Sequence, residues 1–251
     1  MSETVVAANW KMNKTVSKSD DLIKEILKNT PAVKSVTCVI FPPFLSIPSA
    51  AKLIKNTHVE LGAQNMHSAQ NGAFTGEVSG LMLQDFCSYV LLGHSERRLL
   101  FGETDEFVNE KLSAAINCGL RPIVCVGEQS LDRQKGLTEN VIRNQIKNSF
   151  KNISDIGNII VAYEPVWAIG TGTAASPDDA EDVNRFIRNE LGSIFGAEGV
   201  SKTPILYGGS VTENNIGDFL GKPNVNGALI GGASLNSEGF TEILRAASNL
   251  S

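Results

Sequence analysis

Three side chains that could transfer protons or stabilise negative charge stand just after apolar, β-branched runs of the sequence. Lys11, His94 and Glu164 each come within two residues of the end of such a run. An ammonium, an imidazole and a carboxylate that meet in one site can attract an anion, polarise a carbonyl and remove a proton. Each side chain alone could equally serve a structural role, but their joint placement predicts a proton-transfer active site.

The local sequence favours a particular role for two of these groups. His94 precedes a helix expected to begin near Ser95, and the positive end of a helix dipole disfavours imidazolium. A neutral His94 can donate a hydrogen bond to a carbonyl or hydroxyl oxygen. Glu164 precedes Pro165, which biases Glu164 toward extended backbone at a strand end. Its carboxylate is therefore a candidate general base.

Glycine-rich segments in the later part of the chain predict a phosphate site. These segments are Gly170–Gly172, Gly208–Ser210 and Gly231–Gly232. Bare backbone N–H groups, the Ser210 hydroxyl and a helix N-terminus can together bind phosphate, commonly after the seventh and eighth strands of a barrel. Lys11 would supply local attraction for an anion in a chain whose net charge is −5.

The segment Gly170–Ala175 also matches the G-x-G-x-x-A pattern of dinucleotide sites. It begins several residues past its expected strand, and no acidic residue ends a following strand about 20 residues later. We therefore interpret Pro165–Gly172 as a lid whose apolar side chains exclude water when it closes.

Eight short apolar runs predict the strands that position these side chains. Their first residues are about 32 residues apart on average between residues 5 and 227, close to the length of one β-α-β unit. Strands of nearly continuous apolar character are typical of a parallel sheet with a covered outer face. The runs are Val5–Asn9, Val36–Phe41, Val59–Ala63, Tyr89–Gly93, Arg121–Val126, Ile159–Tyr163, Pro204–Gly208 and Gly227–Ile230.

The intervening segments predict helices. Ser176 is a good N-cap before Pro177, and a second helix is expected to begin near Thr138. No linker or composition shift divides residues 1–251, so we expect one α/β domain, a closed (β/α)8 barrel with a parallel eight-stranded core, rather than two doubly wound halves. The apolar stripe of the first helix is Ala180, Val183, Ile187, Leu191 and Ile194.

Composition narrows the possible functions. Hydrophobic residues make up 42% of the chain and aromatic residues 6%, and the net charge is −5, so a basic, base-stacking nucleic-acid surface is excluded. No apolar run reaches the roughly 18 residues that span a bilayer, and Lys11 and Lys14 interrupt the region where a signal peptide would be apolar. The sequence predicts a soluble, cytoplasmic protein without nucleic-acid or membrane partners.

Metal-ligand patterns and two common catalytic motifs are absent from the sequence. The three histidines form no H-x-x-x-H pair and the four cysteines no C-x-x-C pair. Neither the G-x-S-x-G elbow nor the G-x-x-x-x-G-K-[ST] loop occurs. We expect reduced core thiols and a reaction that needs no metal and no cofactor.

One predicted connection is unusually long. Gln64–Ser79 is polar and contains glycine, and long loops in compact domains are uncommon and often functional. A surface excursion without function is one interpretation. The apolar tip Ala73–Phe74 favours a second interpretation, an arm that a partner or second subunit covers.

Five motifs between residue 9 and residue 235 stand out: Asn9–Asn13, Gly93–Arg98, Ala162–Gly172, Tyr207–Ser210 and Gly227–Leu235. Together, and in this order, they resemble the triosephosphate isomerase family. The resemblance implies a TIM barrel that interconverts D-glyceraldehyde 3-phosphate and dihydroxyacetone phosphate through an enediolate, in glycolysis and gluconeogenesis. It also implies a homodimer in which the long loop around Thr75 enters the neighbouring subunit.

The resemblance also implies roles for individual residues. Glu164 corresponds to the base that transfers the proton between carbons, His94 to the electrophile at the substrate oxygens, and Lys11 to the group that stabilises negative charge. No metal or cofactor takes part. The residues implied in substrate and phosphate binding are Asn9, Lys11, Gly170, Ser210, Gly231 and Gly232.

Two departures from the family pattern and two alternative functions remain. Thr173–Ala174 replaces a Lys-Thr pair common at the end of the lid, and Asn226 stands where Asp is common, which could remove an ion pair near the eighth strand. The alternatives are another cofactor-free sugar-phosphate enzyme, such as an aldolase with Lys11 as Schiff-base nucleophile, and a barrel without catalytic activity.

Overall fold

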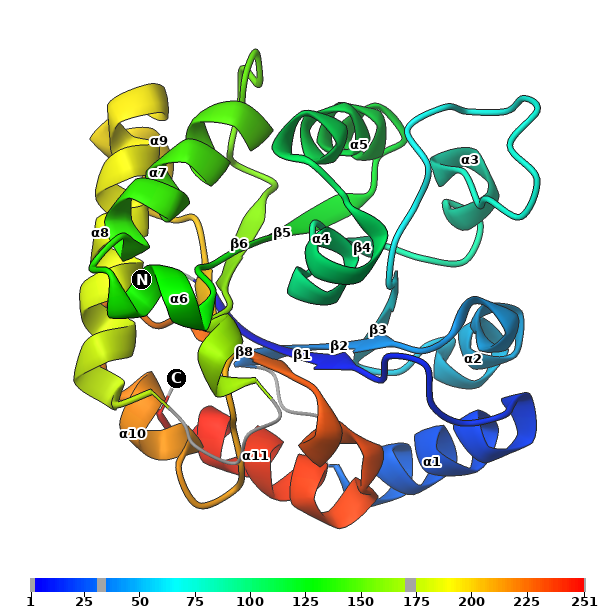
Figure 1. The fold of residues 1–251 in the computed structure, drawn as a ribbon. Coiled ribbons are helices and arrows are strands. Elements are labelled where there is room, and N and C mark those ends of the chain that lie inside the picture. The colour runs from blue at the N-terminus through cyan, green and yellow to red at the C-terminus, as the bar shows by residue number, and fades with distance from the viewer. Residues whose placement is uncertain (1–2, 31–34, 170–174, 251) are drawn as a thin grey trace.

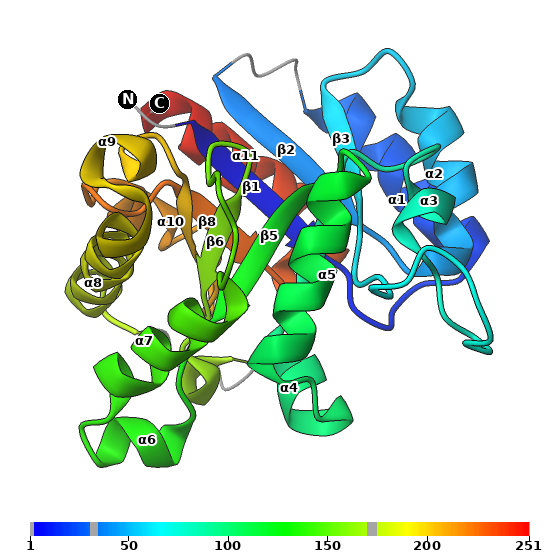
Figure 2. The same ribbon diagram turned by 90° about the horizontal axis from the view of Figure 1, so that it is seen from above.

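Parallel strands form a closed barrel in the computed structural model, which describes residues 3–30, 35–169 and 175–250. Each strand pairs with the next, and β8 pairs with β1 to close the sheet. Helices surround the sheet on its outer side (Figure 1; Figure 2). The predicted (β/α)8 barrel is confirmed. The strands are β1 Thr4–Asn9, β2 Val36–Phe41, β3 Val59–Ala63, β4 Tyr89–Leu92, β5 Arg121–Val126, β6 Ile160–Tyr163, β7 Ile205–Tyr207 and β8 Gly227–Ile230.

Helices and short 3₁₀ turns connect the strands. No described helix combines the length and the apolar character that crossing a bilayer requires. The helices are α1 Val16–Asn29, α2 Ile47–Ile54, α3 Gly80–Leu83, α4 Ser95–Phe101, α5 Asp105–Asn117, α6 Ser130–Gln134, α7 Thr138–Ser149, α8 Pro177–Phe195, α9 Ala197–Val200, α10 Ile216–Leu220 and α11 Ser237–Leu250. The 3₁₀ turns are η1 Phe44–Ser46, η2 Val166–Ala168 and η3 Gly232–Leu235.

Helix α8 begins as its sequence predicts, but its buried face differs at one position. The Ser176 hydroxyl accepts a hydrogen bond from the N–H of Asp179, which is the predicted N-cap. Ile194, which we expected in the apolar stripe, is 47% exposed. Asn184 is buried instead, because its side-chain amide donates to the carbonyl of Asn224. A polar contact to a loop carbonyl therefore occupies part of the face that periodicity assigns to apolar residues.

The core has two layers because successive strand residues point to opposite faces of the sheet. Val5, Ala7, Phe41 and Leu206 belong to a cluster of strand residues that fills the barrel interior. Their sequence neighbours on the strands, such as Val6, pack against the helices. Burial on both faces explains the nearly continuous apolar character of the strands.

Asn226, one of the departures noted in the sequence, lies against a half-buried cation. Arg188 donates from Nη2 to Oδ1 of Asn226 at 2.8 Å, and the N–H of Ile205 donates to the same oxygen at 3.0 Å. Asn226→Asp would keep this oxygen in place and add a charge beside the guanidinium. The hydrogen bond from the guanidinium would thereby become an ion pair, and a well-placed ion pair contributes up to about 1 kcal/mol.

We therefore expect Asn226→Asp to raise the free energy of unfolding at pH 7 by about 1 kcal/mol, measured by urea denaturation. A carboxyl whose pKa is lowered in the folded state contributes stability above its unfolded-state pKa of about 3.9 and loses it as the pH falls below that value. The gain should thus be lost as the pH falls through the lower folded-state pKa, and it should be much smaller at pH 3 than at pH 7. Equal or lower stability at pH 7 would show that the guanidinium gains nothing from a charged partner.

Candidate active site

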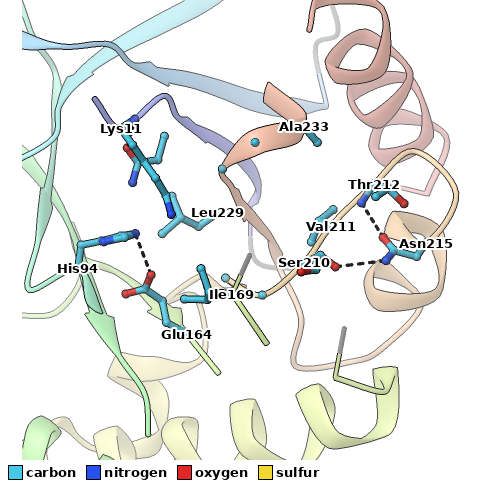
Figure 3. A pocket seen from close by; sticks show the side chains of 15 residues that line it. Lys11, His94, Glu164, Ile169, Ser210, Val211, Thr212, Asn215, Leu229 and Ala233 are labelled. Carbon is cyan, nitrogen blue, oxygen red and sulfur yellow. Dashed lines mark hydrogen bonds and ion pairs between the residues drawn. The ribbon is translucent and has the colours of Figure 1, made fainter. Parts of the chain in front are cut away.

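A pocket of about 440 Å³ opens at the carboxyl ends of the barrel strands. Predicted site residues line it on two sides: Lys11, His94 and Glu164 lie on one side, and Ser210 lies on the other (Figure 3). Gly170, also predicted as a site residue, lies outside the described residues. The lining residues are Asn9, Lys11, His94, Glu164, Ile169, Gly208, Gly209, Ser210, Val211, Thr212, Asn215, Leu229, Gly231, Gly232 and Ala233.

His94 is positioned by the turn from β4 into helix α4. Gly93 has a φ of 64°, in the left-handed region that favours glycine, and this turns the chain from the strand into the helix. His94 is the N-cap residue of α4, and its Nδ1 accepts the N–H of Glu96 at 3.2 Å. The opposite ring nitrogen, Nε2, lies 2.9 Å from Oε1 of Glu164. The helix terminus thus aims Nε2 into the pocket.

Glu164 is buried at the end of β6, where it is 2% exposed. Its Oε2 accepts the N–H of Ser95 at 2.8 Å, and its Oε1 lies 3.2 Å from the Ser95 hydroxyl. A buried carboxylate requires such donors. We did not predict this role for Ser95 from the sequence; its signal was its position as first residue of the helix, since the first N–H groups of a helix lack partners.

The charges of His94 and Glu164 depend on each other. Burial lowers the pKa of His94, but the Glu164 carboxylate outweighs burial and raises it above its ordinary value. Burial raises the pKa of Glu164, but His94 and the Ser95 hydrogen bonds outweigh burial and lower it. Because Nδ1 of His94 accepts the Glu96 N–H, it carries no proton. We therefore assign a neutral His94 that donates from Nε2 to an ionised Glu164.

Lys11 has a strained backbone that several contacts stabilise. Its φ is 52°, uncommon for a residue other than glycine. Its N–H donates to Oδ1 of Asn9 at 3.0 Å, and its carbonyl accepts from Nε2 of Gln64 at 2.8 Å. Its Nζ lies 2.7 Å from Oε1 of Glu96. These contacts direct the ammonium group into the pocket, and strain of this kind is common at functional sites.

The side of the pocket opposite His94 consists of loops and short helical turns. Asn215 supports this side by donating to the carbonyl of Ser210 at 3.2 Å and accepting the N–H of Thr212 at 2.8 Å (Figure 3). Gly231 and Gly232 lie at the start of η3. A Cβ placed on Gly231 would lie 3.4 Å from Cε of Lys11, so the bare backbone of this turn lies next to the cation. This arrangement is suited to binding an anionic group.

Residues 165–169 are the described part of the predicted lid, and one of them reaches the pocket. The turn η2 contains Trp167, whose Nε1 donates to Oε1 of the buried Glu128 at 2.9 Å, and Ile169 lines the pocket. The N–H of Ala175 donates to the Tyr207 hydroxyl at 3.0 Å. Thr173–Ala174 lies outside the described residues.

The chemistry that the pocket offers is acid–base and electrostatic. Within residues 3–30, 35–169 and 175–250, no group of three or more His, Cys, Asp or Glu side chains is arranged to hold a metal ion. The groups at hand are one carboxylate, one imidazole and one ammonium. They can remove a proton, polarise an oxygen and stabilise the resulting anion.

Comparison with known proteins gives a consistent result. Residues 4–247 match the model of the family described as Triosephosphate isomerase. A triosephosphate isomerase of Aquifex aeolicus is 47% identical over 242 residues, covering 96% of this chain and 98% of that protein. The protein of that name from Carboxydothermus hydrogenoformans is 46% identical over 248 residues, covering 98% and 99%. One from Dehalococcoides mccartyi strain BAV1 is 44% identical over 247 residues, covering 98% and 97%.

Proposed function

The chain belongs to the triosephosphate isomerase family, and from this premise we propose how its residues divide the reaction between them. The enzyme interconverts D-glyceraldehyde 3-phosphate and dihydroxyacetone phosphate, a step of glycolysis and gluconeogenesis. A proton moves between two adjacent carbons through an enediolate. The observation that supports the assignment of roles is the 2.9 Å contact between Nε2 of His94 and Oε1 of Glu164 beside the pocket.

Glu164 is the general base in this proposal. Its pKa lies below the ordinary value, so it is ionised at neutral pH and can accept a proton. In the structure it accepts hydrogen bonds from Ser95. When it removes the proton from one carbon and returns it to the other, the carboxylate gives up these hydrogen bonds and contacts the substrate.

His94 and Lys11 act on the oxygens and the charge of the enediolate. A neutral His94 donates from Nε2 to the substrate oxygens and passes protons between them. The Lys11 ammonium, next to Gly231, stabilises the negative charge that develops during proton removal. Asn9 accepts the N–H of Lys11 and thereby helps to orient the ammonium group.

The phosphate binds on the opposite side of the pocket in this proposal. Ser210 supplies a hydroxyl there, and Gly231 and Gly232 supply bare backbone, with Gly231 next to Lys11. Gly170, in the predicted lid, is the fourth residue that we assign to phosphate binding. We further propose that residues 1–251 act as one domain in the cytoplasm, and that the enzyme requires neither metal nor cofactor.

The test is conversion of D-glyceraldehyde 3-phosphate by chelator-treated protein without added cofactor, with dihydroxyacetone phosphate followed by a coupled reductase. We expect rapid turnover. Borohydride treatment in the presence of dihydroxyacetone phosphate provides the control for the aldolase alternative. A covalent adduct on Lys11, or no turnover from folded protein, would overturn the proposal.

We propose that the enzyme is a homodimer joined through the loop around Thr75. The cyan segment between β3 and α3 extends outward from the barrel in both views (Figure 1; Figure 2). Phe74 near its tip is 47% exposed and lies 4.1 Å, ring centre to ring centre, from His67. Met12, after β1, is 97% exposed. Exposed apolar side chains of this size favour a covering partner.

Deletion of Asn71–Thr75 should therefore shift the protein from dimer to monomer in sedimentation velocity. The reason is that it removes Phe74 and the exposed tip while leaving the barrel strands intact. Phe74→Ser, which keeps the loop length, should weaken the dimer less. A deletion variant that sediments as an unchanged dimer would contradict the role of this loop.

A further inference from the structure

The backbone around Glu164 is hydrogen-bonded to the end of β5 and to the residues just after it. The N–H of Glu164 donates to the carbonyl of Val126 at 2.8 Å, and the N–H of Val166 donates to the carbonyl of Glu128 at 3.1 Å. Gly127 lies between these two contacts, and a Cβ placed on it would lie only 1.8 Å from the Glu164 carbonyl oxygen. A displacement of Gly127 would therefore displace the backbone of Glu164.

The peptide groups of Gly127 lie where the sheet no longer provides a partner on the β4 side. The register between these strands ends at Leu92 and Val124. Gln145 of helix α7 replaces the missing strand: its Oε1 accepts the N–H of Gly127 at 2.7 Å, and its Nε2 donates to the Gly127 carbonyl at 3.0 Å. One side-chain amide thus satisfies both peptide groups of one residue, which buried backbone requires.

There is free space beside this contact. A cavity of about 60 Å³ is lined by Gln145, Gly127, Glu164, Cys125 and other residues, including three of helix α4. Packing alone therefore does not hold Gly127 in place. The two hydrogen bonds from Gln145 hold it instead.

We propose that Gln145 is a positioning residue for the base Glu164, acting through the backbone of Gly127. This inference rests on the proposed role of Glu164. Gln145 is not among the residues that line the substrate pocket, so it influences the reaction only by fixing where the carboxylate stands. A carboxylate displaced by about 1 Å can lose about 100-fold in rate, because proton transfer depends steeply on geometry.

The first test is Gln145→Ala. We expect kcat to fall about 10- to 100-fold, while KM changes by less than about twofold because the phosphate side of the pocket is untouched. Asn144→Ala, an exposed amide one residue earlier on the same helix, is the matched control and should leave both constants unchanged. A folded Gln145→Ala variant with kcat near wild type, or with its loss confined to KM, would overturn the proposal.

The second test is Gln145→Glu, which keeps the side-chain shape and makes the contact depend on pH. A protonated carboxyl can accept from the Gly127 N–H and donate to its carbonyl, whereas a carboxylate cannot donate. The ratio of variant to wild-type kcat should therefore rise at least about threefold from pH 8 to pH 5.5, as burial and Glu164 favour the protonated form and Arg98 opposes it. A ratio independent of pH would contradict the positioning role.

Glu164→Gln separates this inference from the proposal on which it rests. If Glu164→Gln is inactive and both Gln145 variants behave like wild type, only the positioning role is wrong. If Glu164→Gln remains active, the assignment of the base is itself wrong.

Discussion

Glu164→Gln should lower kcat by about 10³- to 10⁴-fold and leave KM within a small factor of wild type. The variant removes the only carboxylate among the residues that line the pocket and keeps the shape and size of the side chain. The amide can still accept from the N–H of Ser95, as the carboxylate does at 2.8 Å. It cannot accept a proton from carbon, so the loss falls on the chemical step.

The measurement is steady-state kinetics in both directions, with circular dichroism to establish folding. Glu139→Gln is the matched control, because Glu139 lies on helix α7 with 69% of its side chain exposed and makes a long, 4.0 Å ion pair with Arg143. The control should retain wild-type kcat. A folded Glu164→Gln variant within tenfold of wild type would exclude Glu164 as the base.

The fold could be predicted closely from apolar runs and turn residues. The bounds of β2, β3, β5 and β8 agree with the predicted runs. Four predicted ends are one residue too long, at Gly93, Ile159, Pro204 and Gly208, and two of these have a local reason. Gly93 has a left-handed φ of 64° and leaves β4, and Pro204 lacks the N–H that a strand residue would donate. Parallel strands are easy to predict from sequence because both of their faces are buried, which makes them nearly continuous apolar runs.

The identities of the site residues could be predicted from the sequence, but the contacts that fix their geometry could not. The rule that functional side chains follow barrel strands placed Lys11, His94 and Glu164 together, and all three line one pocket. The partners that set their geometry stand far away in the chain. Ser95 binds Glu164 across 69 residues, and Gln64 binds the Lys11 carbonyl across 53 residues. Such contacts depend on register and side-chain direction, which a single sequence does not encode locally.

The same limit applies to Gln145 and Asn226. In the sequence, Gln145 is one of several polar residues of helix α7, and only the three-dimensional contact shows that its amide pairs with Gly127. Asn226 differs from the family pattern, but its neighbour Arg188 appears only when α8 packs on the barrel. In both cases the side chain hydrogen-bonds to a group that lacks a partner strand: the Gly127 peptide groups for Gln145, and the Arg188 guanidinium for Asn226.

Lys11→Met should lower kcat/KM by about 10³-fold, the second largest effect we expect. Methionine keeps an unbranched stem of similar length and removes the charge that faces Gly231. Removing one group that stabilises developing negative charge costs about 10²- to 10³-fold in kcat, and weaker attraction of the anionic substrate adds a loss in KM. Kinetics at two ionic strengths should show a smaller salt effect in the variant than in wild type.

The chain offers a matched control for Lys11→Met. Lys14 is exposed and, like Lys11, has a positive φ, 74° compared with 52°, so Lys14→Met makes the same substitution in a similar backbone conformation. It should leave kcat/KM unchanged. Lys11→Arg adds a further comparison, because arginine keeps the charge but cannot form a Schiff base. Partial recovery in Lys11→Arg would support an electrostatic role, and a Lys11→Met variant within tenfold of wild type would refute it.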